Sequence, residues 1–243
     1  MPPTGNEVRT LAYYSQVLYD LHEHLRRVGR FPTEEQAAPI RAFFNDGKKI
    51  IMGQCGRSFG KTECNLYIAW RYALTHPNSE VYIVCPERLQ AKKIYWLRKR
   101  LQYYGPQKYV LEHRESELRT VFRNGSYIIL DGCENYAALR GIKPALVIYD
   151  EFQHHSHEFD EEVMQPNLAS GTPLVVMGTP PKIDCYYVEF RSNHITAINN
   201  GDTSRFYLEL PTWCNPTQSR SWLESKRQEL LRRKRYNVWL REY

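Results

Sequence analysis

The stretch "IMGQCGRSFGKTEC", residues 51–64, constrains the fold of this 243-residue chain more than any other segment. A short apolar strand, residues 48–53, leads into a loop containing glycine, and an amphipathic helical pattern, residues 62–74, follows it. In such a strand–loop–helix unit, the backbone N–H groups and the helix dipole favour a bound anion. The unit predicts a phosphate-binding loop in which Lys61 reaches the β- and γ-phosphates and Thr62 is a ligand of Mg²⁺.

The spacing of this loop departs from the usual pattern, G-x-x-x-x-G-K-[ST]. Cys55 stands where the first glycine is expected, and the next residue is a glycine that comes one place late. An arginine lies inside the loop. The predicted phosphate site comprises Gly56, Arg57, Ser58, Phe59, Gly60, Lys61, Thr62 and Glu63.

Further apolar strands are expected at residues 80–86, 145–149, 173–178 and 205–213. Helical patterns cover residues 8–27, 33–44 and 88–105, and Thr33 with Gln36 resembles a capping box at the start of the second. Uniformly apolar strands that alternate with helices indicate a mainly parallel sheet covered on both faces. Asn124 and Gly125, between two strand-like segments, predict a β-hairpin with a type I′ turn.

Two adjacent acids, Asp150 and Glu151, end the apolar strand "ALVIY". Acids at the carboxyl edge of a strand can place one carboxylate near the metal and the next beside the γ-phosphate. We therefore predict that Asp150 helps to hold Mg²⁺ and that Glu151 orients or deprotonates an attacking water. A plain acidic loop is the alternative. A glutamate positioned for water indicates hydrolysis, whereas a small-molecule kinase must exclude water.

Two other segments near these strands have a less specific pattern. Gly178, Thr179 and Pro180 close the next apolar strand, where a hydroxyl could sense the γ-phosphate, although a plain turn has the same pattern. Three histidines in "HHSH", residues 154–157, are candidate metal ligands. Zinc needs three or four N or S ligands in a tetrahedral array. We expect a solvated loop beside the active site instead.

Most of the net charge of +6 is concentrated at the end of the chain. Residues 219–243 hold eight Lys or Arg and three acids, and the basic segment there is Arg232, Arg233, Lys234 and Arg235. A solvated helix face is one interpretation of such a segment. Contact with a polyanion such as a nucleic-acid backbone is the other, and the sequence alone does not separate them.

Several classes of protein are disfavoured by the sequence. No apolar run approaches the ~18–20 residues that a membrane-spanning helix needs. The N-terminus shows no basic flank followed by an apolar core, so we expect no signal peptide. Six scattered cysteines without a C-x-x-C pair favour a reducing cytoplasm over a zinc ribbon or a disulfide framework.

Three segments in this order, "GRSFGKT", "ALRGIKPALVIYDE" and "VVMGTPP", resemble the ATPase domain of the large terminase subunit. Large terminases are the motors that drive viral DNA into the procapsids of tailed phages and herpesviruses. The resemblance runs from about Phe31 to the C-terminus. The off-register loop with its internal arginine is itself typical of this family.

The resemblance implies roles for individual residues. "FPTEEQAAPIRAF" is similar to the segment that recognises adenine, with Gln36 in the place of the family's glutamine. Arg57 matches the loop arginine, which acts as a sensor or finger in its own site. Arg140 matches an arginine that the family assigns to the neighbouring subunit's site. The tripeptide 178–180 matches the coupling motif.

The same resemblance implies the cofactors, partners and location. It implies ATP and Mg²⁺, double-stranded DNA, a homo-oligomeric ring on a capsid portal, a small terminase subunit, no membrane, and the host cell cytoplasm. Full-length large terminases also carry a nuclease domain of the ribonuclease-H type. Nothing after Glu209 looks like that domain, so we expect an excised ATPase domain or an incomplete chain, without nuclease activity.

These inferences predict an α/β fold, a P-loop NTPase of the RecA-like type with a catalytic glutamate, built as a three-layer sandwich. We expect a helical extension over residues 1–30, an ATPase core over residues 31–200, and a small lid subdomain with a basic helix over residues 201–243. The predicted function is Mg-dependent ATP hydrolysis coupled to translocation of double-stranded DNA into a procapsid.

Two alternatives to this function stay open. "DEFQ" also resembles the DExx box of superfamily 1 and 2 helicases, although those motors need a second RecA-like lobe. A nucleotide-gated assembly module with little turnover is the other alternative. An ATPase assay with and without double-stranded DNA separates the three.

Overall fold

One mixed sheet of eight strands, in the order β3-β4-β5-β2-β6-β7-β1-β8, organises the molecule. The structure is a computed structural model that describes residues 5–166, 171–183 and 185–243. The strands are β1 Ile50–Cys55, β2 Glu80–Cys85, β3 Val110–Arg114, β4 Arg119–Phe122, β5 Tyr127–Gly132, β6 Leu146–Asp150, β7 Leu174–Gly178 and β8 Arg205–Leu210. Neighbours from β5 to β8 pair in parallel, and β3 and β4 extend one edge in antiparallel pairing. The predicted mainly parallel sheet is confirmed.

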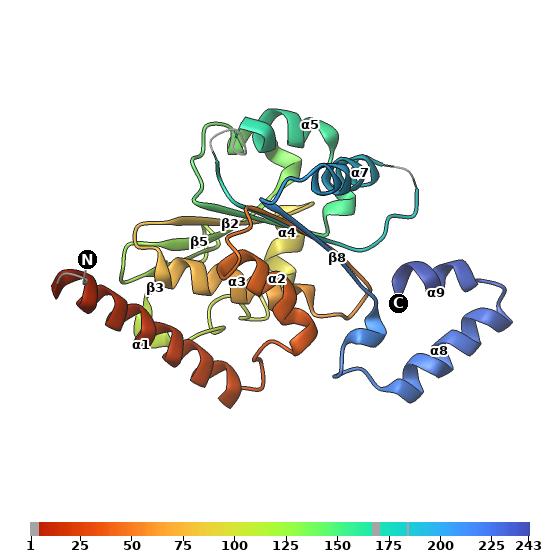
Figure 1. Cartoon of the computed structure of the whole chain (residues 1–243), viewed down its shortest axis with the longest axis horizontal. Coiled ribbons are helices and arrows are strands. Elements are labelled where there is room, and N and C mark those ends of the chain that lie inside the picture. Colours follow the sequence, from red (N-terminus) through yellow and green to blue (C-terminus); the bar gives the residue numbers. More distant parts are fainter. Residues whose placement is uncertain (1–4, 167–170, 184) are drawn as a thin grey trace.

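Helices cover both faces of this sheet (Figure 1). The α-helices of the described residues are α1 Gly5–Arg27, α2 Glu34–Phe44, α3 Lys61–Thr75, α4 Arg88–Ala91, α5 His157–Phe159, α7 Tyr186–Asn199, α8 Arg220–Arg232 and α9 Tyr236–Glu242. The shorter 3₁₀ and π segments are η1 Lys92–Trp96, η2 Gln107–Tyr109, η3 Cys133–Leu139, η4 Phe152–His154, η5 Asp160–Met164 and η6 Thr212–Cys214. No helix in the described part of the chain is long and apolar enough to cross a membrane.

Each face of the sheet has its own apolar core. On one face, Leu21 of α1, Ile40 of α2 and Trp70 of α3 pack in a single buried cluster. On the other face, Phe159 of α5 and Tyr187 of α7 belong to a second cluster. Every residue of β6 and of β7 is buried, which agrees with their uniformly apolar sequences. The arrangement confirms the predicted three-layer sandwich.

Local sequence signals set the ends of several elements. The predicted capping box opens α2: the Thr33 hydroxyl accepts from the backbone N–H of Gln36, and the Gln36 side chain accepts from the backbone N–H of Thr33. The hairpin of β4 and β5 is confirmed, but the type I′ turn is wrong. Phe122 and Ser126 close a loop of three residues, and Gly125 has a φ of 83° while Asn124 is not in a positive-φ conformation. The sequence analysis did not predict strand β3.

The predicted long helix over residues 88–105 is wrong. α4 ends at Ala91 and continues only as the π segment η1 to Trp96. The wider π turn brings Tyr95 fully into the core, and Lys99 then adopts a left-handed φ of 53°. A turn follows, in which the N–H of Leu101 donates to the carbonyl of Tyr95, and Tyr104 is again fully buried. Apolar periodicity continues through this turn, so the sequence pattern alone does not reveal where the helix ends.

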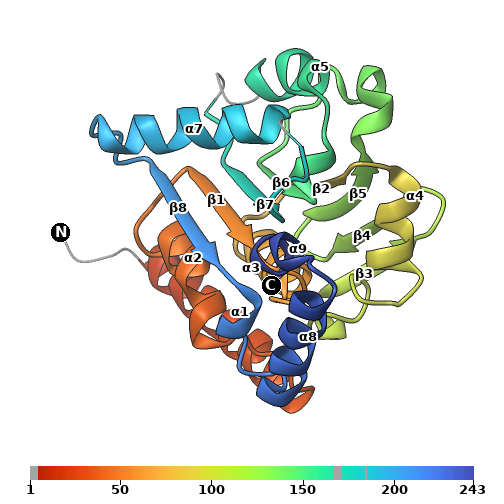
Figure 2. The same cartoon turned by 90° about the vertical axis from the view of Figure 1, so that its right-hand side faces the viewer.

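The helices α8 and α9 form a small pair with a cluster of their own, made of Leu223, Leu230 and Trp239. Figure 2 shows this pair in front of the carboxyl end of β1. Backbone hydrogen bonds join the two regions, since the N–H of Arg57 donates to the carbonyl of Glu242. This contact brings the end of the described chain onto the loop that follows β1.

Candidate active site

Strand order places three predicted segments side by side. β7 lies between β6 and β1, with Asp150 opposite Met177 and Gly178 opposite Gln54. All three strands are parallel, so their carboxyl ends meet at one edge of the sheet. The loop after β1, the acids after β6 and the tripeptide after β7 therefore converge, as the sequence predicts.

The loop between β1 and α3 has a specific backbone shape. Gly60 has a φ of 103°, a conformation that side-chain-bearing residues rarely adopt. A β-carbon there would also lie 2.1 Å from Nε2 of Gln36. That amide instead donates to the carbonyl of Phe59 at 3.0 Å. Gln36 thus holds the loop, and Cys55, at the expected glycine position, is a buried core residue.

Lys61 is the centre of the site. Its side chain is almost fully buried, and its ammonium donates to the Thr179 hydroxyl at 2.9 Å. The same ammonium lies 3.8 Å from Oε1 of Glu151. A cation at the start of α3, a hydroxyl just after β7 and a carboxylate just after β6 thus face one another.

The neighbouring acid, Asp150, is buried and hydrogen-bonded on both oxygens. The Tyr95 hydroxyl donates to Oδ2 at 2.7 Å, and the backbone N–H of Glu151 donates to Oδ1 at 3.1 Å. Asn65 of α3 donates in turn to the Tyr95 oxygen at 3.3 Å. Burial, and then the nearby Glu151 carboxylate, raise the pKa of Asp150 to about 6. A cation beside Asp150 would stabilise its ionised form.

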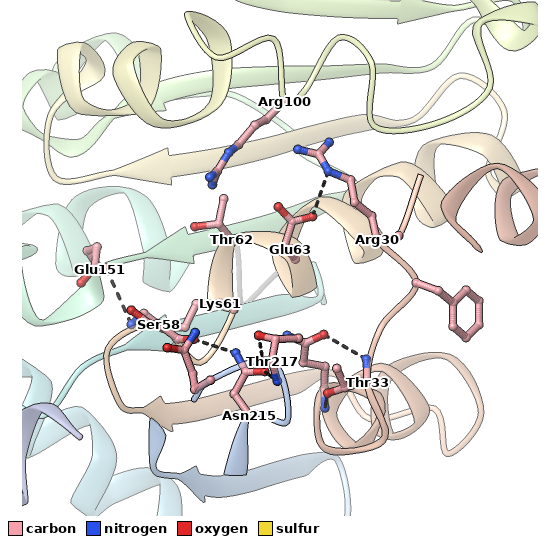
Figure 3. Close-up of a pocket in the computed structure, with 15 residues that line it drawn as sticks. Arg30, Thr33, Ser58, Lys61, Thr62, Glu63, Arg100, Glu151, Asn215 and Thr217 are labelled. Atoms are coloured by element: carbon pink, nitrogen blue, oxygen red, sulfur yellow. Dashed lines mark hydrogen bonds and ion pairs between the residues drawn. The ribbon is translucent and has the colours of Figure 1, made fainter. Parts of the chain in front are cut away.

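Two cavities meet at Lys61. The larger, of about 480 Å³, extends from Lys61 and Thr62 towards the segment before α2. In Figure 3, Arg30, Glu63 and Arg100 lie on one side of it, and Thr33, Asn215 and Thr217 lie on the other. The smaller, of about 320 Å³, lies between Arg57, Glu151, Gln153, Thr179 and Glu242. Together they form a continuous cleft, and Glu151 and Lys61 line both parts of it.

The C-terminal segment contacts the loop between β1 and α3. The Arg57 guanidinium pairs with the Glu242 carboxylate, and this hydrogen bond raises the pKa of Arg57. The Thr212 hydroxyl donates to the carbonyl of Arg57 at 2.6 Å. The Asn215 amide donates to the carbonyl of Ser58 at 2.7 Å. Arg57 therefore points to α9, and its side chain is largely exposed.

Arg140 lies apart from this cleft. It follows η3, pairs with Glu162, and has its guanidinium carbon 5.7 Å from the centre of the Tyr136 ring. Among the residues that the structure describes, those that line the two cavities at Lys61 do not include Arg140. Its side chain is more than half exposed, so it is accessible to another molecule.

The basic segment, residues 232–235, is exposed: Arg232 ends α8, and residues 233–235 form the turn that leads to α9. Arg233 pairs with Glu229 at 3.0 Å. Arg233 and Arg235 also line a third cavity, of about 280 Å³, together with Lys182 from the loop after β7. Basic side chains from two distant parts of the sequence therefore share one surface next to Arg57.

The histidine loop differs from the solvated loop that the sequence suggests. His154 is exposed and lines the smaller cavity, but His155 is buried against Tyr149 and Phe159. Burial lowers the pKa of His155 to about 3. One ring nitrogen lies 3.1 Å from the carbonyl of Asp150. His155 thus contacts the backbone of Asp150 from within the apolar cluster that contains Tyr149 and Phe159.

Several site residues were missed by the sequence analysis: Asn65, Tyr95, Gln153, Asn215 and Glu242. Tyr95 is one aromatic in an amphipathic run, and only the π turn directs it to Asp150. Gln153 lies two residues after Glu151, and this short spacing was the one available signal. Asn215 and Glu242 reach the loop through contacts between distant segments, which no local pattern reveals.

The strand order and the loop carrying Lys61 define a P-loop NTPase. The family model described as terminase large subunit, T4likevirus-type, N-terminal, matches residues 52–222. The chain therefore belongs to this family of terminase large-subunit N-terminal domains. The predicted family is confirmed.

Solved structures show the same fold. The large terminase ATPase domain of Thermus phage P74-26 matches with a TM-score of 0.67 and 20% identity, over 90% of this chain and 97% of that one. The large terminase of a thermophilic bacteriophage matches with a TM-score of 0.64 and 17% identity, over 81% of this chain and 50% of that one. The large terminase of bacteriophage HK97 matches with a TM-score of 0.59 and 17% identity, over 72% and 38%. A comparison with curated proteins finds no match.

Proposed function

We propose that this chain hydrolyses Mg-ATP and couples the hydrolysis to movement of double-stranded DNA into a viral procapsid. The observation that carries the proposal is the position of Lys61, whose ammonium lies 2.9 Å from the Thr179 hydroxyl and 3.8 Å from the Glu151 carboxylate. Membership in the terminase family supports it. The large terminase of the thermophilic bacteriophage, which shares the fold, has been solved with ATP-gamma-S and with ADP.

In this proposal, each group at the cleft has one task. The N–H groups of the loop and the Lys61 ammonium bind the β- and γ-phosphates. Glu151 accepts a proton from the water that attacks the γ-phosphate, and the Thr179 hydroxyl senses whether that phosphate is present. The larger cavity extends to Gln36, so adenine would lie beside the segment before α2.

The residues present fit a magnesium ion. Asp150 keeps lone pairs beyond the two that accept hydrogen bonds, and Thr62 lines the cleft at the first turn of α3. Magnesium in nucleotide sites takes one or two protein oxygens and completes its shell with phosphates and water. When bound, it neutralises charge that develops on the phosphates. Tyr95 and the N–H of Glu151 would orient the Asp150 carboxylate towards it.

The two predicted arginines have different places in the proposal. Arg57 lies within the loop, so it serves its own site, and it must leave Glu242 before it can reach a phosphate. Arg140 is exposed and remote from the cleft, which suits a finger that acts on a neighbouring subunit in a ring. The ring on a capsid portal, the small terminase subunit and the host cytoplasm are parts of the same proposal.

The proposed division of the chain follows from these roles. In this division, residues 1–30 are a helical extension, residues 31–200 are the ATPase core, and residues 201–243 are the lid subdomain. The first strand of the last segment, β8, pairs with β1 and so belongs to the sheet of the core. The separate cluster of α8 and α9 and their contacts with the phosphate loop support this division.

Duplex DNA is expected to bind weakly to the basic surface that includes Arg232, Arg233, Lys234 and Arg235. Phosphate contacts release counterions, so log affinity should fall with log salt by roughly 0.9 per contact. Replacing all four residues with Gln should weaken binding and reduce this slope. Fluorescence anisotropy with labelled duplex at several salt concentrations measures both quantities.

A charge-matched control loses four positive charges elsewhere, at Arg26, Arg27, Lys48 and Lys49. This control should keep the salt slope of the wild type. If the basic-segment variant and the wild type show the same affinity and slope, the segment is a solvated face and DNA binds elsewhere.

The proposed function is tested by phosphate release from Mg-ATP with and without duplex DNA. We expect hydrolysis that DNA stimulates and that EDTA abolishes. Slow, DNA-independent release would favour an assembly module. Strand separation of duplex DNA by the protein alone would favour a helicase-like motor.

A further inference from the structure

Gln153 links two of the proposed catalytic segments. It lies in η4, two residues after Glu151, and its side chain spans the gap to the end of β7. Its Nε2 donates to Oε2 of Glu151 at 2.6 Å. The backbone N–H of Thr179 donates to its Oε1 at 3.0 Å. One side chain thus contacts both the proposed general base and the residue proposed to sense the γ-phosphate.

An amide is the chemical group that suits both partners. The Glu151 carboxylate can only accept a hydrogen bond, and the N–H of Thr179 can only donate one. The two partners therefore determine which end of the Gln153 amide carries the oxygen. A carboxylate at position 153 would have no proton to donate and would repel Glu151, and a hydrocarbon would bind neither partner.

This link closes a circuit of polar contacts around Lys61. The Lys61 ammonium bonds to the Thr179 hydroxyl and lies near Glu151, while Gln153 joins those two residues from the other side. The fit is tight, because a β-carbon on Gly178 would lie 3.0 Å from Oε1 of Gln153. A shift of the segment after β7 would therefore reach the Glu151 carboxylate through Gln153.

Glu151 combines an uncommon backbone conformation with few side-chain contacts among the residues that the structure describes. Its φ is 52°, a left-handed conformation that residues other than glycine rarely adopt. Of the side-chain contacts that the structure gives for the Glu151 carboxylate, the hydrogen bond from Gln153 is shorter than the approach of Lys61. Gln153 therefore determines the direction of the carboxylate.

We propose that Gln153 is a positioning residue for hydrolysis, which orients Glu151 and links that orientation to Thr179. This inference rests on the proposed function, because it assigns Glu151 the role of base. Gln153 itself does not contact the reacting atoms. It makes the activity of the base depend on whether Thr179 has engaged the γ-phosphate.

The test is Gln153→Met, which keeps the length of the side chain and removes both hydrogen bonds. Loss of a hydrogen bond to a charged group corresponds to about a 10- to 100-fold fall in kcat. The affinity for ATP-gamma-S, measured by calorimetry, should stay within about twofold, because uniform binding is not affected. Gln153→Asn, whose shorter amide cannot span both partners, should show the same split between kcat and affinity.

The matched control is Gln16→Met on α1, an exposed glutamine bonded to Asp20 at 3.0 Å, which should keep the wild-type kcat. Unchanged kcat in both Gln153 variants, with an active wild type, overturns the role of Gln153 and leaves the proposed function standing. Equal loss of kcat and nucleotide affinity means a structural role and also overturns it. An inactive wild type overturns both proposals.

Discussion

Replacing Glu151 with glutamine is expected to leave ATP binding intact and to lower the hydrolysis rate by about 10²- to 10⁴-fold. Glutamine keeps the shape of the side chain but cannot accept a proton from water. The phosphate loop and Lys61 remain in place, so the affinity for ATP should change little. Single-turnover phosphate release and calorimetric titration with ATP-gamma-S measure the two quantities.

Glu158→Gln is the matched control, because Glu158 is an exposed acid in α5, close in sequence to the site. It should hydrolyse ATP at the wild-type rate. If Glu151→Gln also does so, the base lies elsewhere. Asp131 and Glu134 are then the acids to replace next. They lie near the carboxyl end of β5 and just after it, and β2 separates β5 from β6 in the sheet.

Replacing Arg140 with alanine is expected to abolish hydrolysis, because an arginine supplied from a neighbour can contribute about 10³–10⁵ in rate. The guanidinium pairs with Glu162 and lies outside the cleft of its own chain. A finger that acts between subunits makes a lone domain a poor ATPase. The specific activity of the wild type should therefore rise with protein concentration, which a dilution series measures.

Mixing two inactive variants separates action between subunits from local anchoring. Arg140→Ala mixed with Glu151→Gln should regain partial activity, because an intact Arg140 then meets an intact Glu151 at mixed interfaces. Glu162→Gln is the control for a role of Arg140 in anchoring its own loop. It removes the carboxylate that pairs with Arg140 and leaves the arginine in place. No recovery in a mixture that demonstrably associates would leave Arg57 as the charge-neutralising arginine.

The sequence predicts the sheet and the segments at its edge because these depend on local patterns. Buried parallel strands are apolar throughout, and the order of strand, loop and helix around Lys61 appears in consecutive residues. The positions of Glu151 and Thr179 beside Lys61 follow once the strands are parallel, since the carboxyl ends of these strands share an edge. These parts of the site needed no knowledge of tertiary contacts.

Other parts depend on geometry that no pattern encodes. The π turn at residues 92–96 directs Tyr95 to Asp150, although the apolar spacing there reads as one continuous helix. Arg57 meets Glu242 across 185 residues of sequence. The hairpin at Gly125 was predicted, but its turn type depends on the Phe122–Ser126 pairing, which allows a loop of three residues.

The central claim is that Lys61 belongs to an ATP-hydrolysing phosphate loop, and Lys61→Ala tests it most directly. Phosphate release from Mg-ATP is measured for the wild type, for Lys61→Ala, and for Lys49→Ala, an exposed lysine just before β1. Circular dichroism confirms that each variant is folded. We predict hydrolysis by the wild type and by Lys49→Ala, and none by a folded Lys61→Ala. Normal turnover by Lys61→Ala would contradict the assignment of the phosphate loop.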